Sequence, residues 1–490
     1  MEDAGRGRDA VVIADYLSEL FPANPRAHFR LAHARQSLGE GADAIAPLRR
    51  TIALAPELPH ARNNLAAALM QVGDPPGEII ALLEAAAASD PAEAEPWINL
   101  ATQKIRVLDL EFALRAGAEA VRLAPDNALA CNNYAQALKE AGRRAEAESL
   151  VERAVALSGG QSVYRLNLAM LQLSRGDYAP GWEGFEFRWA VTAERMKSRP
   201  ILGGQPWQGE SLAGKTLLLW GEEGNGDVIQ FARFVPRLAE MVRAQGGRLV
   251  WNSFPQFGEL LKRSLGGHAD SYVSGGISLL PPFDYEFSLL SVPRLLQITD
   301  ETIPVPIPYL RADPTLKDMW RERLAPDRHL KVGLVWTGSP AQGRNPYRSV
   351  DLARYAASLG GIDGVSFYSL QVGGGEEVKA ARAVGFEIAD NTDTFSTYDD
   401  TAAFVDNLDL VITICTSVAH LAGALGKPTW VILDVNAHWI WSLDRADSHW
   451  YPTAKLYRQS RFNDWTPVLE QVARDLGRLS ARQRVLTKIC

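Results

Sequence analysis

A glycine-rich turn that ends in an aspartate is the first segment with residues suited to chemistry. It runs from Gly221 to Asp227 between a predicted strand and a predicted helix, and it includes Gly224 and Gly226. Such a turn lets the backbone approach a ligand at the helix N-terminus. Asp227 is a candidate general base for a hydroxyl group; the alternative, which spacing alone favours, is that it only caps the helix. The segment is not a P-loop, because no Gly-Lys-Ser/Thr follows, and it lacks the third glycine of a dinucleotide fingerprint.

A second segment, Cys415–His420, leads from a predicted strand straight into a predicted helix. Thr416 or Ser417 can cap this helix, and its first amides together with the helix dipole form an anion site. His420 lies on the first turn, close enough to assist. The alternative is an ordinary capped helix with a packed histidine, and without further context that alternative is favoured.

A third segment, Trp336–Ser349, also follows a predicted strand and contains Arg348. The guanidinium fork of Arg348 could clamp phosphate oxygens, and a solvated loop arginine is an equally weighted alternative. The segment Asn436–Tyr451 is rich in tryptophan and histidine. One of its rings could stack on a base, but core filling is favoured for most of them.

The first third of the chain is an internal repeat that a solenoid would explain. The register is marked by Pro22, Pro56, Pro91, Pro125 and Gly159, spaced 34 or 35 residues apart. Small residues keep the same step at Ala32, Ala66, Ala101, Ala135 and Ala169, and helix-ending glycines at Gly39, Gly73, Gly142 and Gly176. A 34-residue period is that of tetratricopeptide repeats, which the segment closely resembles. Such solenoids hold peptides or partner helices in a concave groove.

One polar position recurs in this register and is a candidate peptide-binding row, formed by Asn64, Asn99, Asn133 and Asn167. An amide offers donors and an acceptor to an extended peptide backbone. The solenoid of O-linked N-acetylglucosamine transferase carries a similar asparagine ladder. The equally weighted alternative is that asparagine is simply common at this position. Trp182, Phe185 and Trp189 share one helical face, which predicts a hydrophobic seam rather than an aromatic ligand box.

The rest of the chain alternates between short apolar strands and helices, which predicts parallel sheets. The predicted strands are Lys215–Trp220, Arg248–Asn252, Lys331–Trp336, Val365–Gln371, Leu410–Ile414 and Thr429–Leu433, with helices at Val228–Val242 and Thr466–Leu479. The series breaks once, near residues 311–328, so the pattern predicts two Rossmann-like domains facing a cleft. The predicted domains are a solenoid over residues 1–190 and two Rossmann-like domains over 191–324 and 325–490.

Several short motifs resemble those of heptosyltransferase-type, family 9 glycosyltransferases. They are Gly226-Asp227 with Pro236, Arg348-Ser349, and Thr416-Ser417 followed by His420-Leu421-Ala422-Gly423-Ala424 and Pro428. The resemblance implies a GT-B arrangement, with an acceptor-side domain over residues 191–324 and a donor-side domain over 325–490. It further implies a nucleotide-sugar donor of unspecified nucleotide, and metal-independent inversion. It also implies that Asp227 deprotonates the acceptor, and that Arg348, Thr416, Ser417 and His420 bind the leaving phosphate, beside a turn containing Gly224 and Gly226. Fusions of this type that modify flagellin make a protein Ser/Thr the expected acceptor and flagellin a candidate.

One departure from the family pattern keeps other functions open. Heptosyltransferases have an aspartate close to the donor sugar where this chain has Cys415. The alternatives are therefore a transferase for a lipid-linked or polysaccharide acceptor, or a protein-binding scaffold whose α/β half has lost turnover.

Charge and composition restrict the partners and the compartment. The formal net charge of −7 argues against a nucleic-acid partner, and three distant cysteines form neither a disulfide framework nor a metal site. The first residues lack the apolar core of a signal peptide, and no apolar run is long enough for a membrane span. These features predict a cytoplasmic protein.

Overall fold

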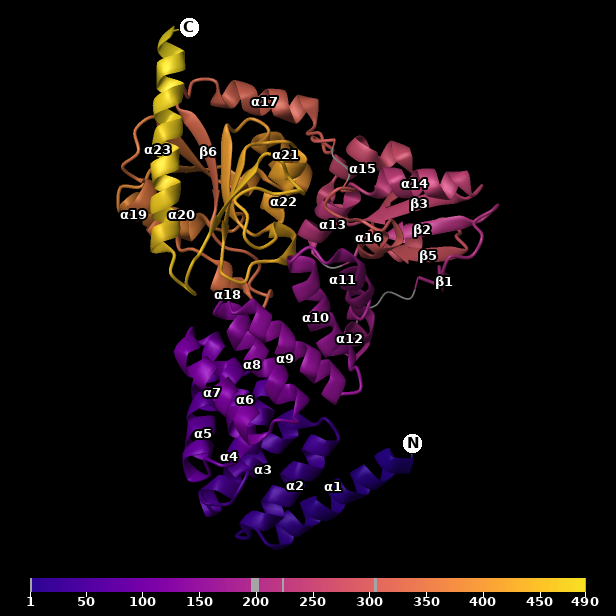
Figure 1. Cartoon of the computed structure of the whole chain (residues 1–490), viewed down its shortest axis with the longest axis vertical. Coiled ribbons are helices and arrows are strands. Elements are labelled where there is room, and N and C mark those ends of the chain that lie inside the picture. Colours follow the sequence, from indigo (N-terminus) through magenta and orange to yellow (C-terminus); the bar gives the residue numbers. More distant parts are fainter. Residues whose placement is uncertain (1, 195–201, 223, 304–305, 490) are drawn as a thin grey trace. The chain divides into compact units, whose positions relative to one another are not determined.

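A computed structural model gives the structure of this chain and describes residues 2–194, 202–222, 224–303 and 306–489 (Figure 1). The chain divides into two compact units, unit 1 over residues 1–164 and unit 2 over residues 165–490. Each unit is described by itself below. Glu223 of the glycine-rich turn and Cys490 lie outside the described residues.

Unit 1 is a series of helices in which each helix packs against the next. They are α1 (Glu2–Leu20), α2 (Pro25–Ser37), α3 (Gly41–Leu54), α4 (Ala61–Val72), α5 (Pro76–Ser89), α6 (Ala94–Arg106), α7 (Leu110–Leu123), α8 (Ala128–Glu140) and α9 (Arg144–Leu157). The first helices of successive repeats begin at Pro25, Ala61, Ala94 and Ala128, which matches the predicted 34-residue register. The tetratricopeptide-like helical solenoid is thus confirmed.

The residue types that marked the repeat have the predicted structural roles. The side chains of Ala32, Ala66, Ala101 and Ala135 are all fully buried, because the two helices of a repeat approach each other there. Gly39, Gly73, Gly142 and Gly176 have φ angles between 73° and 85°. This left-handed conformation ends a helix and favours glycine over any residue with a β-carbon.

Unit 2 begins with helices that continue the repeat pattern, α10 (Ser162–Ser174), α11 (Tyr178–Phe185) and α12 (Arg188–Glu194). Trp182 of α11 is 2% exposed; its ring lies 5.3 Å from that of Trp439, and its Nε1 donates to the carbonyl of Ile298 at 2.8 Å. Trp182 and Phe185 of the predicted seam therefore pack into the core of unit 2. The prediction of a shared helical face is wrong for Trp189, because α11 ends at Phe185 and Trp189 belongs to the next helix, α12.

The α/β part of unit 2 contains two sheets in which every strand pair is parallel. The first has the order β1-β5-β2-β3-β4 and the second the order β11-β10-β9-β6-β7-β8. The first comprises β1 (Gln205–Pro206), β2 (Thr216–Trp220), β3 (Arg248–Ser253), β4 (Ser271–Ser274) and β5 (Tyr285–Ser288). The second comprises β6 (Leu330–Val335), β7 (Val365–Ser369), β8 (Ile388–Asp390), β9 (Leu410–Ile414), β10 (Thr429–Leu433) and β11 (Ala454–Arg458). All six predicted strands are present, and the prediction of a parallel α/β region is confirmed.

Helices cover these sheets and connect their strands. They are α13 (Asn225–Ala232), α14 (Val235–Ala244), α15 (Leu260–Leu265), α16 (Val292–Leu295), α17 (Pro314–Leu324), α18 (Asn345–Arg348), α19 (Leu352–Leu359), α20 (Gly375–Ala383), α21 (Tyr398–Val405), α22 (Ser417–Ala424) and α23 (Thr466–Ile489). The long C-terminal helix α23 extends ten residues past its predicted end at Leu479, and it packs against the second sheet through Leu469 and Leu476.

One predicted helix is wrong. The segment Val228–Val242 forms two helices, because Pro236 lies in the first turn of α14 and α13 has already ended at Ala232. Proline has no N–H to continue the helix, but it is well accommodated in a first turn.

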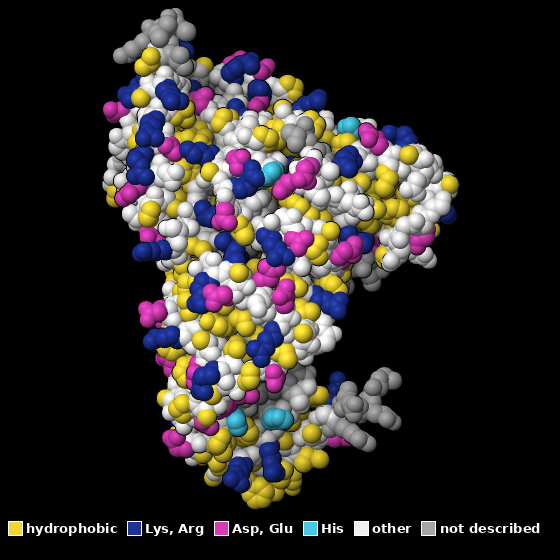
Figure 2. All heavy atoms as spheres, viewed as in Figure 1, with side chains coloured by type: hydrophobic (Ala, Val, Ile, Leu, Met, Phe, Trp, Pro, Cys, Tyr) yellow, Lys and Arg dark blue, Asp and Glu magenta, His cyan; other side chains and the backbone are white. Residues whose placement is uncertain are grey.

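None of the described helices is both long and apolar enough to cross a lipid bilayer. On the face shown in Figure 2, acidic and basic side chains are interspersed rather than separated.

Candidate functional site

The predicted site residues of the second sheet lie at its topological switch point. The chain proceeds from β6 to β7 and β8 on one side, and then returns to β9, β10 and β11 on the other side. Arg348 follows β6, whereas Thr416, Ser417 and His420 follow β9, the direct neighbour of β6. In parallel sheets, ligands bind in the crevice outside the carboxyl ends of two such strands. The topology thus brings two segments 67 residues or more apart in sequence to one edge of the sheet, where Arg348 Nη1 donates to the Cys415 carbonyl.

The glycine-rich turn after β2 reaches this edge from the first sheet, because α13 packs against α22. A β-carbon built on Gly226 would lie 3.1 Å from His420 Cδ2 and 3.4 Å from Ser417 Cα. A β-carbon at this position would force the first turns of these two helices to shift by a few tenths of an ångström, so glycine favours their close approach. The motifs that appeared separately in the sequence are therefore neighbours in unit 2.

Asp227 is the third residue of α13, and the N-cap residue is Gly224. The expectation that Asp227 is itself the N-cap is therefore wrong. Its Oδ2 accepts a hydrogen bond from the Gly224 amide at 3.2 Å, so the carboxylate satisfies an amide at the helix start from inside the helix. Asp227 is partly exposed beside Gly226, and its role as a general base stays a prediction.

The N-terminus of α22 is not closed by the hydroxyl groups that were expected to cap it. Thr416 is the N-cap residue but makes no side-chain capping bond; its Oγ1 lies 3.1 Å from Thr413 Oγ1. Ser417 Oγ accepts from the Tyr398 hydroxyl at 2.7 Å. Asn225 Nδ2 lies 3.5 Å from the same Tyr398 oxygen, which links the starts of α13, α21 and α22.

Arg348 is held in place rather than solvated. Its Nη1 donates to the Cys415 carbonyl at 2.5 Å, and its Nε lies 3.4 Å from Asn345 Oδ1. The guanidinium lies against Gly338, where a β-carbon would be only 2.3 Å from Nη2. The side chain remains partly exposed, so a positive charge of fixed position is available beside the start of α22.

His420 is 6% exposed and its imidazole is fixed by aromatic neighbours. Its ring stacks on Trp441 with centroids 5.5 Å apart, and its Nδ1 lies 3.0 Å from the Tyr451 hydroxyl. Burial, with smaller contributions from His438, Arg233 and Arg348, lowers the pKa of His420 to about 3. The imidazole is therefore neutral at physiological pH.

Cys415, which stands where heptosyltransferases have an aspartate, is integrated into the same cluster. Its Sγ accepts a hydrogen bond from Trp441 Nε1 at 3.1 Å. Burial raises the pKa of the Cys415 thiol, and the positive charge of Arg348 only partly opposes this effect. The thiol is thus protonated at neutral pH and offers a much weaker polar group than a carboxylate.

One charged residue beside the site, Asp434, was missed by the sequence analysis. Asp434 directly follows β10 and is 4% exposed, and its Oδ1 accepts from Arg344 Nη2 at 3.2 Å. His438 lies in the same loop; burial, followed by the charges of Arg348 and Arg344, lowers its pKa to about 4. The position of Asp434 at the carboxyl end of a predicted strand next to Leu410–Ile414 was the available signal.

The predicted peptide-binding asparagines are engaged, at least in part, between repeats of unit 1. Asn99 Nδ2 donates to Asn63 Oδ1 at 3.1 Å, and Asn133 Nδ2 donates to the Ile98 carbonyl at 3.0 Å. Asn133 is only 7% exposed, whereas Asn64 and Asn99 are half-buried. These bonds give Asn99 and Asn133 a structural function, and peptide binding by the four predicted asparagines stays a prediction. Asn167 belongs to α10 and lies in unit 2.

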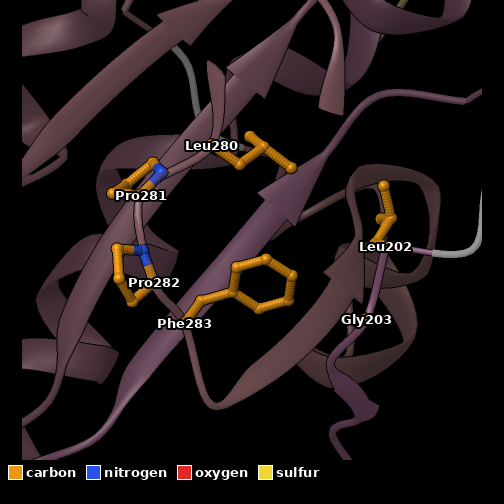
Figure 3. A pocket seen from close by; sticks show the side chains of 6 residues that line it. All are labelled: Leu202, Gly203, Leu280, Pro281, Pro282 and Phe283. Atoms are coloured by element: carbon orange, nitrogen blue, oxygen red, sulfur yellow. The ribbon is translucent and has the colours of Figure 1, made fainter. Parts of the chain in front are cut away.

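A shallow pocket elsewhere in unit 2 lacks ionisable groups. It is lined by Leu202, Gly203, Leu280, Pro281, Pro282 and Phe283 and has a volume of about 340 Å³ (Figure 3). Gly203 precedes β1 and Phe283 precedes β5, so this pocket lies at the amino ends of these strands. The site described above lies at the opposite, carboxyl ends of parallel strands.

Comparison with known proteins gives a distant relative and partial structural neighbours. The chain matches no protein-family model. It is 27% identical over 445 residues to Protein FlbA of Caulobacter vibrioides, an alignment that covers 86% of this chain and 73% of that protein. Among solved structures, TTC0263, a thermophilic TPR protein of Thermus thermophilus, is 20% identical over 35% of this chain, covers 100% of its own chain and gives a TM-score of 0.31. YrrB, a TPR protein with an unusual peptide-binding site, is 16% identical over 37% of this chain, covers 98% of its own and gives a TM-score of 0.29.

Proposed function

We propose that this protein is a glycosyltransferase that moves a sugar from a nucleotide-sugar donor to a Ser or Thr of a polypeptide bound by the repeat solenoid. The observation that carries the proposal is the junction of α13 and α22. There Asp227 follows Gly226 on α13, and Gly226 contacts Ser417 and His420 in the first turn of α22. Arg348 bonds to the carbonyl of Cys415, two residues before the start of that helix. A base for a hydroxyl group and groups that stabilise an anion thus lie around one helix junction. We further propose that the two sheets belong to two Rossmann-like domains in a GT-B arrangement.

The proposed reaction inverts the anomeric carbon in one displacement. The acceptor hydroxyl oxygen forms a bond to the anomeric carbon while its proton passes to the Asp227 carboxylate. The bond from that carbon to the phosphate oxygen breaks, and its electron pair leaves with the phosphate. Arg348, the first amides of α22 and a neutral His420 N–H would stabilise the negative charge that develops there. Stabilisation at the point where charge grows accelerates the step without requiring a change in the protonation of His420.

The repeat solenoid supports a polypeptide as the acceptor. Tetratricopeptide-type solenoids offer a concave surface for peptides, and this chain joins such a surface to the proposed catalytic unit. Bacterial flagellin, the acceptor that the family resemblance suggested, is the first polypeptide to test.

A second candidate function is a protein-binding scaffold without turnover. Two observations favour it: the protonated Cys415 thiol in place of a carboxylate, and the direct packing of Gly226 against Ser417. If the protein is a scaffold, unit 2 would only present the solenoid to its partner.

The test separates donor binding from transfer. The purified full-length chain is screened by thermal shift against nucleotides and nucleotide sugars, since a ligand at 100 times its dissociation constant stabilises a protein by about 2.7 kcal/mol. We expect one nucleotide family to stabilise the wild type and Arg348→Ala to lose that shift. Arg354→Ala, which removes an exposed arginine paired with Asp351, should keep it.

Transfer is then followed by intact-mass analysis of flagellin and of other candidate acceptors incubated with the donor found. We expect Asp227→Asn to bind the donor and to transfer no sugar. Full activity of Asp227→Asn would refute the proposed base. A folded wild type that no nucleotide stabilises would favour the scaffold function, and transfer to a lipid-linked or polysaccharide acceptor alone would refute the polypeptide acceptor.

A further inference from the structure

The Nδ1 edge of the His420 ring lies against a buried tyrosine that the proposed reaction does not use. Tyr451 is fully buried, and its hydroxyl lies 3.0 Å from His420 Nδ1. A β-carbon on Gly423 would lie 2.4 Å from the Tyr451 ring, so the glycine makes the space in which this ring is seated. His420 and Gly423 are on the same helix, α22, and the tyrosine thus packs directly along it.

The neighbours of Tyr451 determine which of the two groups donates the hydrogen bond. The next polar contact of its hydroxyl is Tyr309, with the two oxygens 3.5 Å apart. The Tyr309 hydroxyl already donates to the Ile229 carbonyl at 3.0 Å and accepts from Arg233 Nη2 at 3.2 Å. His420 Nδ1, which lies closer than the Tyr309 oxygen, is therefore the better acceptor for the Tyr451 hydroxyl proton. Burial raises the pKa of Tyr451 and lowers that of His420, so the phenol retains its proton and the imidazole has one proton only.

The opposite edge of the imidazole faces the junction of α13 and α22. His420 Cδ2, the atom bonded to Nε2, lies 3.1 Å from the position of a β-carbon on Gly226. The imidazole stacks on Trp441 with ring planes 20° apart, and this stacking restricts rotation of the ring about the Cβ–Cγ bond. If Nδ1 accepts from Tyr451, the single proton is on Nε2 and on the side of the proposed site.

We infer that Tyr451 is a positioning residue that holds His420 as the Nε2–H tautomer, a fixed neutral donor at the junction of α13 and α22. Arg233 and Tyr309 orient Tyr451: the Arg233 guanidinium lies 4.8 Å from the Tyr309 ring centroid and 4.6 Å from that of Tyr451. The use of this donor for a leaving phosphate rests on the proposed function. The tautomer itself does not, and it can be measured in the unliganded protein.

The first experiment determines the tautomer by nitrogen NMR of the full chain labelled with [15N]histidine. The chain has eight histidines, and His420→Gln assigns the signal of interest. We expect the wild type to carry the His420 proton on Nε2. Tyr451→Phe should change the tautomer ratio about fivefold toward Nδ1–H, as the loss of one hydrogen bond predicts. Tyr457→Phe is the matched control, because it removes another buried hydroxyl, bonded to Asp475 at 3.0 Å, and should leave the His420 signal unchanged.

A wild-type His420 with its proton on Nδ1 would overturn the inference, as would an unchanged ratio in Tyr451→Phe. The wild-type spectrum alone decides the tautomer if Tyr451→Phe does not fold.

The second experiment uses inorganic pyrophosphate as the probe and measures its affinity by calorimetry. We expect His420→Gln to weaken binding about tenfold and Tyr451→Phe to weaken it by up to about fivefold, and the double variant to bind no more weakly than His420→Gln, because Tyr451 acts through His420. Additive losses, or full affinity in Tyr451→Phe with a shifted tautomer, would overturn the positioning role. No binding of pyrophosphate by the wild type would count against the proposed phosphate site, while the tautomer result would stand.

Discussion

Gly226 and His420 lie so close together that a β-carbon on the glycine would be 3.1 Å from Cδ2 of the histidine. Gly226 lies at the start of α13, which follows β2 of the first sheet, and His420 lies in the first turn of α22, which follows β9 of the second sheet. Their contact therefore sets the separation of the two helix starts that carry Asp227 and the proposed phosphate-binding groups.

The first prediction follows from this contact. Gly226→Val should destabilise unit 2 by about 1–3 kcal/mol, because the added methyl groups must displace the buried His420 ring or the Ser417 backbone. Gly477→Ala is the control, since the space around that helical glycine is open and the change should be neutral or slightly stabilising. Urea unfolding followed by tryptophan fluorescence measures both, because twelve of the thirteen tryptophans belong to unit 2 and only Trp97 to unit 1. Equal stability of Gly226→Val and the wild type would show that the helices separate readily.

The second prediction concerns pH. The pKa of His420 is about 3 in the folded protein and about 6.5 in an unfolded chain. Between these values the unfolded chain binds a proton that the folded protein does not, so stability falls as the pH drops below 6.5 and is unaffected above it. The expected contribution of His420 is about 1.4 kcal/mol per pH unit, or about 2 kcal/mol between pH 6.5 and pH 5.

Urea unfolding at pH 8, 6.5 and 5 tests this linkage. His420→Gln should lose this part of the pH dependence, whereas His268→Gln, which replaces an exposed histidine, should not. Some dependence should remain in His420→Gln, since burial also lowers the pKa of His438 to about 4. Parallel pH profiles for the wild type and His420→Gln would contradict a buried neutral imidazole.

The third prediction distinguishes structural from ligand-binding asparagines in unit 1. Asn133→Ala should cost about 1–2 kcal/mol, because it removes the donor to the buried Ile98 carbonyl from a side chain that is itself buried. Asn64→Ala should cost less, since that side chain is half-buried. Hydrogen exchange of peptides from α4, which contains Asn64, and from α6 and α8, read by mass spectrometry, reports both. If partner affinity falls in Asn64→Ala while its exchange matches the wild type, the asparagine acts in binding; unchanged affinity there would leave only the structural function.

Elements of the fold could be predicted where the residues that define them are close together in sequence, within one strand, helix or repeat. The repeat register was readable because each position, such as Ala66 or Ala101, meets the same neighbours one repeat later. Strands with five or more apolar or β-branched residues, such as Leu410–Ile414, were predicted at their observed bounds. The missed strands are short or mixed in polarity. β1 has two residues, β8 three and β4 four, whereas β5 contains Glu286 and β11 contains Lys455 and Arg458.

The parts of the site that were missed depend on tertiary structure. Tyr451 is 31 residues from His420 in sequence, and Tyr398 is 19 residues from Ser417, so neither pair follows a helical or strand period. The sequence placed Asp227 near the helix start. Which residue is the N-cap depends on backbone angles that the sequence does not specify, and in the structure it is Gly224. Residue types identified the motifs, and the order of strands at the switch point determined which of them meet.

The last prediction concerns the one departure from the glycosyltransferase pattern. Cys415 lies between the Arg348 guanidinium, bonded to its carbonyl, and the Trp441 indole, bonded to its sulfur. Cys415→Asp would place a carboxylate where a donor and a positive charge already lie, so we expect the variant to fold. Under the proposed function it should change which nucleotide sugars stabilise the protein, because a strong acceptor for sugar hydroxyls replaces a protonated thiol.

A thermal-shift panel on the wild type, Cys415→Asp and Cys415→Ser measures this, with the serine variant as a neutral control of similar size. If all three proteins respond to the same donors by the same amounts, residue 415 does not contact the donor sugar, and the departure from the family has no bearing on donor choice.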